Sequence, residues 1–191
     1  GIRLQNHIHG FQRAQLLKPL AASQTPKLSY YVKKFEVLND NQTVPNVETT
    51  YWCRLVKLPE DFRKKTHIIQ YEAVIQNGSE SLVHHMELFH CEVDGSLQLP
   101  SWDGLCADPS LPEPLKACKR VIAAWAMGAS AMIYPRNVGL PVGGANYSLY
   151  VMLEIHYNNP GLQAGAVDAS GVRLYYTDHL RPIDAGILEI G

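Results

Sequence analysis

Short apolar segments, separated by Asn, Asp, Gly and Pro, follow one another along most of this chain. They are rich in β-branched and aromatic residues and are bounded by turn residues, a pattern that predicts β-strands. The segments cover residues 28–38, 49–58, 67–75, 81–91, 149–158, 172–177 and 186–190. Within 67–75, Ile69, Tyr71, Ala73 and Ile75 alternate with Gln70, Glu72 and Val74, the period of two expected of a half-buried strand. Asn77 and Gly78 tolerate positive φ, so they predict a hairpin between the strands on either side.

One segment has the period of a helix instead. Its apolar residues recur at intervals of three and four, with prolines that can start a helix and a glycine that can end it. The residues concerned are Pro112, Pro114, Leu115, Cys118, Val121, Ile122, Trp125 and Gly128. The Pro- and Gly-rich residues 134–148 are expected to form a loop. Seven or eight strands with one short helix predict an all-β fold, an antiparallel sandwich of jelly-roll type.

The chain of 191 residues is long enough for one large core. Residues 1–26 show no sustained period, so we expect a linker or the end of an upstream domain, followed by one domain over residues 27–191. A net charge of -1 with mixed signs makes neither nucleic acid nor an anionic membrane an evident partner. No apolar stretch approaches the roughly 20 residues of a membrane-spanning helix.

Cysteines and sequons point to an oxidising compartment. The four cysteines are not in paired CxxC spacings, so two disulfides are the better interpretation. Three Asn-X-Ser/Thr sequons, at Asn41, Asn77 and Asn146, are possible N-glycosylation sites. We therefore expect a secreted protein or one of a secretory-vesicle lumen.

Two adjacent histidines, His84 and His85, lie inside an apolar strand segment. Imidazole is the commonest metal ligand, and a site with few carboxylates and thiols favours copper, zinc or nickel over calcium or magnesium. Because adjacent strand residues point to opposite faces, a shared ion requires a bulge, an edge position or ligation through the ring nitrogen nearer the backbone.

A third ligand must come from elsewhere, and His156, near the end of another apolar strand, is the best candidate. His90 is the rival, but it lies about 20 Å from His84 along an extended strand. Surface or hydrogen-bonded positions are expected for five histidines, namely His90, His67, His179, His7 and His9.

Five motifs carry a resemblance to a known family. They are TTYWC at 49–53, VHHMELFHC at 83–91, CKRVIAAWAMGA at 118–129, LEIHYNNP at 153–160 and SGVRLYYT at 170–177. In this order they resemble the N-terminal domain of the copper type II, ascorbate-dependent monooxygenases, from about Val44 onward, and they are closer to the dopamine and tyramine β-hydroxylase branch than to the peptide-amidating branch. The opening QRAQLLKP also resembles the linker that follows an upstream domain in that branch.

The resemblance implies that His84, His85 and His156 bind the electron-donating copper through their Nδ1 atoms. It implies ascorbate as the reductant of the whole enzyme and a phenylethylamine-type amine as its substrate. In the family a second copper domain binds oxygen and hydroxylates the substrate, and that domain is not part of this chain. We therefore expect the chain alone to bind and cycle one copper ion with little or no hydroxylase activity.

The resemblance also implies the disulfides Cys53–Cys106 and Cys91–Cys118, the second of which would tie the histidine strand to the start of the predicted helix. Met86 is expected to pack in the core, and Glu87 and Glu154 can orient a histidine by hydrogen bonding. Four aromatic residues are expected in the core or beside the ligands, namely Tyr51, Trp52, Trp125 and Tyr157.

Two other classes of protein remain open. A three-histidine zinc hydrolase would use an activated water and a nearby general base, and its metal would be redox-silent. A secreted, disulfide-linked β-sandwich that only binds a partner would hold no metal at these histidines.

Overall fold

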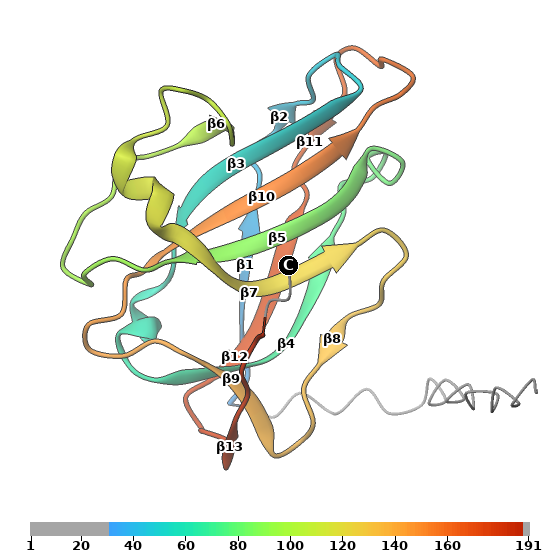
Figure 1. Ribbon diagram of the computed structural model, residues 1–191. Coiled ribbons are helices and arrows are strands. Elements are labelled where there is room, and N and C mark those ends of the chain that lie inside the picture. Colours follow the sequence, from blue (N-terminus) through green and yellow to red (C-terminus); the bar gives the residue numbers. More distant parts are fainter. Residues whose placement is uncertain (1–30, 189–191) are drawn as a thin grey trace, which may run out of the picture.

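Two β-sheets pack face to face in the computed structural model, which describes residues 31–188 (Figure 1). The five-stranded sheet has the order β6 (Asp103–Leu105), β3 (Thr49–Lys57), β10 (Tyr150–Asn158), β5 (Val83–Cys91) and β7 (Cys118–Ala126). The facing sheet has the order β1 (Lys33–Leu38), β12 (Gly171–Thr177), β4 (Thr66–Val74), β9 (Val138–Val142) and β13 (Ile183–Asp184), with β8 (Met132–Ile133) beside β4. A small third sheet pairs β2 (Gln42–Thr43) with β11 (Val167–Asp168).

Within residues 31–188, every strand pairing is antiparallel except that of β13 with β9. The all-β antiparallel sandwich predicted from the segment pattern is therefore confirmed. The expected linker over residues 1–26 lies outside the described residues.

The main hydrophobic core lies between the two sheets. Val37 and Leu174 from one sheet meet Met86, Leu153 and Ile155 from the other, and all five are fully buried. The predicted core position of Met86 is thus confirmed. Each such side chain stabilises the fold by about 1.5–3 kcal/mol relative to exposure.

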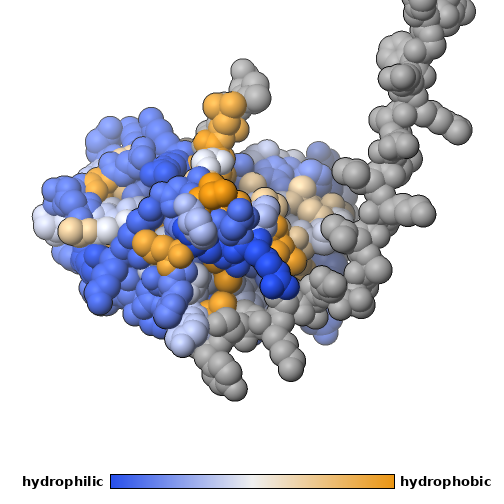
Figure 2. Space-filling view, turned by 90° about the horizontal axis from the view of Figure 1, so that it is seen from below, coloured by the Kyte–Doolittle hydropathy of each residue, from blue (hydrophilic) through white to orange (hydrophobic). Residues whose placement is uncertain are grey.

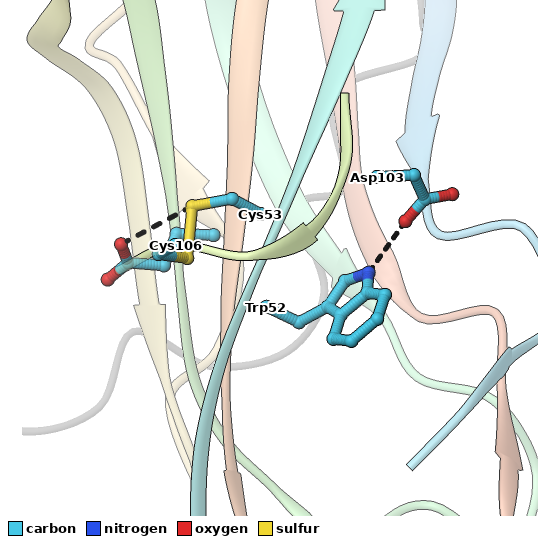
Figure 3. Close-up of a disulfide and its surroundings, with 5 residues drawn as sticks. Trp52, Cys53, Asp103 and Cys106 are labelled. Atoms are coloured by element: carbon cyan, nitrogen blue, oxygen red, sulfur yellow. Dashed lines mark hydrogen bonds between the residues drawn. A yellow bond between two sulfur atoms is a disulfide. The ribbon is translucent and has the colours of Figure 1, made fainter. Parts of the chain in front are cut away.

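A second apolar cluster covers the outer face of the five-stranded sheet. The segment between β5 and β7 folds back over this face, so that Leu99 and Leu115 pack against Met152 and both disulfides. One disulfide joins Cys53 to Cys106 and the other joins Cys91 to Cys118, the two pairs that the family resemblance implies. Figure 3 shows Cys53 and its neighbour Trp52 pointing to opposite sides of β3, with the Trp52 indole nitrogen donating to Asp103 at 2.6 Å.

The prediction of a helix after Pro112 is wrong from Cys118 onward. A 3-10 helix, η2 (Glu113–Ala117), follows Pro112, and the rest of the apolar stretch is strand β7. The pairing of β7 with β5 skips Ile122 and Lys119 at two register shifts. Each shift moves the buried positions by one residue, so the strand acquires the spacing of three and four residues that imitates a helix.

Three other expectations also fail. The turn at Gly78, with φ of 93°, does not close a hairpin, because β4 and β5 belong to different sheets. The expected loop at 134–148 contains β9, in which Pro141 is tolerated because β13 pairs only with the start of that strand. The last strand was expected over residues 186–190, but residues 186–188 do not form a strand, and residues 189 and 190 lie outside the described part. The last strand observed, β13, ends two residues before this segment.

The end of the molecule formed by β8, β9 and β13 carries small hydrophobic patches interrupted by hydrophilic ones (Figure 2). Its exposed apolar side chains include Ile133 and Ile183, each about half exposed. Isolated exposures of this kind are ordinary and indicate no docking surface. No helix in the described residues is long and apolar enough to cross a membrane.

Candidate metal centre

His84, His85 and His156 converge at an irregularity in the pairing of β5 with β10. His156 lies opposite His85, whereas the next residue, Tyr157, lies opposite Val83, so the pairing skips His84. This β-bulge is one of the three devices expected to let adjacent strand residues reach one ion. The His85 Nδ1 atom lies 3.2 Å from Nδ1 of His84 and 3.1 Å from Nδ1 of His156.

These nitrogens fit a small metal ion. Two imidazole nitrogens bound to one ion at about 2.0–2.1 Å lie about 3.3–3.6 Å apart at tetrahedral or trigonal angles, slightly farther apart than the two pairs here. A proton can lie between two of the three nitrogens but not among all three at once. A cation at the centre would satisfy all three lone pairs, and a set of neutral nitrogen donors suits copper or zinc.

The surroundings keep two of the rings in the form that binds metal. Burial lowers the pKa of His85, against an opposing effect of Glu87. Burial and the other two histidines lower the pKa of His156. Both rings are therefore neutral near neutral pH, as metal ligation requires.

Tyr51 orients His156 from the neighbouring strand β3. The two rings are stacked, with centroids 4.5 Å apart and planes 6° apart. His156 Nε2 is buried and has no hydrogen-bond partner among the described residues, so the stacked Tyr51 ring, and not a hydrogen bond at Nε2, orients this imidazole. Of the two positions that the sequence offered for Tyr51, the core or beside the ligands, the structure shows the second: the ring lies against His156 and the side chain is 43% exposed. Only its register opposite His156 in β10, which the sequence does not give, reveals the contact.

Glu87 and Glu154 lie directly opposite each other on β5 and β10, two pairs along from His85 and His156 and on the same face. Their carboxylate oxygens lie within 4.8 Å of each other and of a His85 ring nitrogen. No hydrogen bond joins either carboxylate to a histidine in the part of the chain described here, and of the two only Glu87 acts on the pKa of His85, through its charge. Burial and the charge of Glu87 raise the pKa of Glu154.

An open hollow of about 350 Å³ adjoins His85, lined by Glu87, Trp125 and three alanines. Trp125 was expected to face inward from a helix. Instead it lies on β7, packs at the edge of the main core and donates its indole N–H to the Ala129 carbonyl oxygen at 2.8 Å.

The other described histidines have partners of their own. His90 is buried, stacks on Tyr147 and places Nε2 3.0 Å from the Ser148 carbonyl oxygen. His67 is fully buried; its Nδ1 accepts a hydrogen bond from the backbone N–H of Arg181, so Nε2 carries the proton that it donates to Asp184 at 2.8 Å. His179 is exposed and lies against Tyr31. The expectation of surface or hydrogen-bonded roles is confirmed for these residues, and His7 and His9 lie outside the described residues.

The three sequon asparagines, Asn41, Asn77 and Asn146, are exposed. Asn41 has a φ of 51°, and the Asn146 side-chain oxygen accepts a hydrogen bond from the Gly95 N–H at 3.3 Å. Their exposure is compatible with glycosylation.

Comparison with known proteins agrees with this geometry. Residues 35–164 match the copper type II ascorbate-dependent monooxygenase family, N-terminal domain. Human dopamine β-hydroxylase is 46% identical over 184 residues, 95% of this chain and 29% of that protein. Tyramine β-hydroxylase of Caenorhabditis briggsae is 51% identical over 154 residues, 80% of this chain and 26% of that protein. Human DBH-like monooxygenase protein 1 is 39% identical over 191 residues, the whole of this chain and 30% of that protein.

The chain thus spans less than a third of the length of these relatives, which extend beyond the region it matches. The matched region contains β3, β5 and β10, the strands that carry the histidines and Tyr51. The chain belongs to the copper type II ascorbate-dependent monooxygenase family and corresponds to its N-terminal domain.

Proposed function

We propose that this domain binds one copper ion through the Nδ1 atoms of His84, His85 and His156 and serves as the electron-donating half of an ascorbate-dependent monooxygenase. The observation that carries the proposal is the convergence of three Nδ1 atoms at a β-bulge, with neighbouring pairs 3.1 and 3.2 Å apart. Such a cluster of lone pairs is unfavourable unless a cation lies among them.

Each residue of the site has a separate task. The bulge brings the ring of the exposed His84 beside that of His85, while Tyr51 holds the ring of His156 by stacking. Partial burial keeps His85 and His156 unprotonated. Copper bound here would take up one electron from ascorbate and give it up again, which three neutral ligands permit in either oxidation state. Since His84 is exposed, a reductant can reach the site from solvent.

The remainder of the proposal concerns the whole enzyme. Because the relatives are longer than this chain, we propose that a second copper domain of the same polypeptide activates oxygen and hydroxylates an amine of the phenylethylamine class. Relatives with the names dopamine β-hydroxylase and tyramine β-hydroxylase support this class of substrate. Two disulfides support a secreted protein or one of a secretory-vesicle lumen.

The test is copper binding by the metal-free chain. Cu(I) affinity is measured by competition with a chromophoric chelator, and ascorbate reduction is followed by loss of the Cu(II) electron paramagnetic resonance signal. We expect one copper per chain, reduced by ascorbate. Loss of a residue that only hydrogen-bonds to a metal ligand weakens metal binding by up to about 100-fold. His84→Ala and His156→Ala remove a ligand itself, so each should weaken copper binding by more than that. His179→Ala, which replaces an exposed histidine elsewhere, is the matched control.

Three results would contradict the proposal. A preference for zinc with no reducible metal would favour the hydrolase alternative. Absence of stoichiometric metal would leave a module that only binds a partner. Equal copper binding by His156→Ala and the control would place the metal at another site.

A further inference from the structure

A buried hydrogen-bond network lies directly behind the histidine cluster, on the inner side of the five-stranded sheet. Tyr157, which follows His156 on β10, is fully buried. Its hydroxyl donates to Asp168 Oδ2 at 2.7 Å and accepts a hydrogen bond from Asn39 Nδ2 at 2.7 Å. Because Asn39 follows β1 and Asp168 belongs to β11, the hydroxyl joins three segments that are far apart in the sequence.

Asp168 extends the network to Ser170 and, through it, to Gln76. This carboxylate is fully buried and also accepts hydrogen bonds from the Ser170 backbone N–H, at 3.1 Å, and from the Ser170 hydroxyl. The Ser170 hydroxyl oxygen in turn accepts the backbone N–H of Gln76 at 2.8 Å. Gln76 begins the turn that leads into β5 and to His84. The network therefore joins β10, at Tyr157, to the segment between β4 and β5, at Gln76.

The pairing of the strands shows what the network can hold in place. Tyr157 pairs with Val83, the residue immediately before His84, and the next amide, of Asn158, donates to the Leu82 carbonyl oxygen at 2.8 Å. If this last pair slipped by one residue, the bulge at His84 would be lost and the imidazoles would separate. A buried hydroxyl and carboxylate are costly unless fully hydrogen-bonded, so they strongly favour this one register.

We infer that Tyr157, through Asp168, is a positioning residue for the metal centre: its hydroxyl fixes the register at the bulge and so keeps the three Nδ1 atoms together. This inference rests on the proposed copper site. It differs from a packing role of the tyrosine ring, which would not need the hydroxyl.

The test compares two tyrosines that make the same kind of bond. Tyr157→Phe removes the network hydroxyl and keeps the ring. Tyr176→Phe is the matched control, since Tyr176 is also buried and donates to a carboxylate, that of Asp61, at 2.9 Å, but lies on β12 in the other sheet. The readouts are Cu(I) affinity by chelator competition, amide hydrogen exchange at residues 83–85 in the metal-free protein, and melting temperature.

We expect both variants to melt at lower temperature, but only Tyr157→Phe to exchange faster at 83–85. It should also bind Cu(I) about tenfold to 100-fold more weakly, the range for residues that orient metal ligands. Copper affinity and exchange equal to those of Tyr176→Phe would overturn the inference. If Tyr157→Phe does not fold, Asp168→Asn is measured against the same control and the same thresholds.

The two proposals fail in different ways. The proposed function and the inference are both overturned if the unaltered chain binds no copper, or if the His156→Ala variant binds copper as tightly as the unaltered chain does. An unaltered chain that binds copper through His156, while Tyr157→Phe behaves as the control does, overturns the inference alone.

Discussion

Removing the disulfide between Cys91 and Cys118 should separate the stability of the sandwich from the chemistry of its metal centre. The two cysteines are 27 residues apart, and a loop of that length restricts the unfolded chain by about 3.5 kcal/mol in the chain-entropy account. We therefore expect the double variant Cys91→Ala/Cys118→Ala to lose about this much free energy of unfolding. The disulfide Cys53–Cys106, with a separation of 53 residues, gives about 4.2 kcal/mol by the same reasoning and serves as a comparison.

Copper affinity should respond differently. Cys91 ends β5, six residues from His85, and six residues span about 20 Å along a strand. Sites this far apart act independently to within about 0.5 kcal/mol, which corresponds to a factor of about two in affinity. The unfolding free energy is measured by urea denaturation of the metal-free protein, and Cu(I) affinity is measured at a temperature where the variant is fully folded. A loss of stability below about 1 kcal/mol would refute the loop reasoning, and a tenfold loss of affinity in the folded variant would refute the independence of the two ends.

Three further substitutions test the core, the ring stacking and the carboxylate pair. Met86→Ala leaves space at a fully buried position and should cost about 2–5 kcal/mol in urea denaturation; unchanged stability would mean that the site is not packed as described. Tyr51→Leu removes the ring stacked on His156 and should lower Cu(I) affinity about two- to tenfold, from an aromatic pair energy of about 0.5–1.5 kcal/mol; a chelator competition with no difference would contradict the orienting role. Burial and the charge of Glu87 raise the pKa of Glu154 in the folded, metal-free protein. Between the ordinary carboxyl pKa and this raised pKa, the folded protein holds a proton that the unfolded chain has released, so the free energy of unfolding falls as the pH rises through that range. Glu154→Gln should therefore be more stable than the unaltered protein at neutral pH, with the difference shrinking in acid; urea denaturation showing the same difference at both pH values would contradict this.

The hydrophobic pattern was sufficient for the long strands other than β7 and for the fold class. The segment 67–75 corresponds to β4 within one residue at each end, because its apolar residues and its flanking turn residues agree. The pattern was not sufficient for pairing. Asn77-Gly78 is a strong local turn signal, but whether a turn closes a hairpin or crosses between sheets depends on which faces the two strands bury against the rest of the chain.

At the site, the sequence supplied the residue types and the family motifs, while the structure supplied the reason why adjacent histidines can act together. Strand alternation places His84 and His85 on opposite faces, and a bulge opposite His156 removes the conflict. A bulge has no reliable local signal, since it depends on the partner strand. The contact of Tyr51 with His156 was out of reach for the same reason, because it arises from the register of β3 against β10.

The wrong prediction of a helix over β7 and the convergence of the three histidines therefore have a common origin, which is the irregular pairing of β5 with both of its neighbours. Against β7, two register shifts move the buried positions of the partner and imitate a helical period. Against β10, one shift brings the ring of the second histidine beside that of the first. Bulges cost regular ladder hydrogen bonds, so three of them around one strand require compensation. The disulfide at Cys91 fixes the β7 edge at one end, and the network of Tyr157, Asp168 and Ser170 holds the β10 edge at the other. The histidines lie at the β10 edge, so it is the register there, more than the disulfide or the identity of any single neighbour, that makes a three-histidine site possible on a β-sheet.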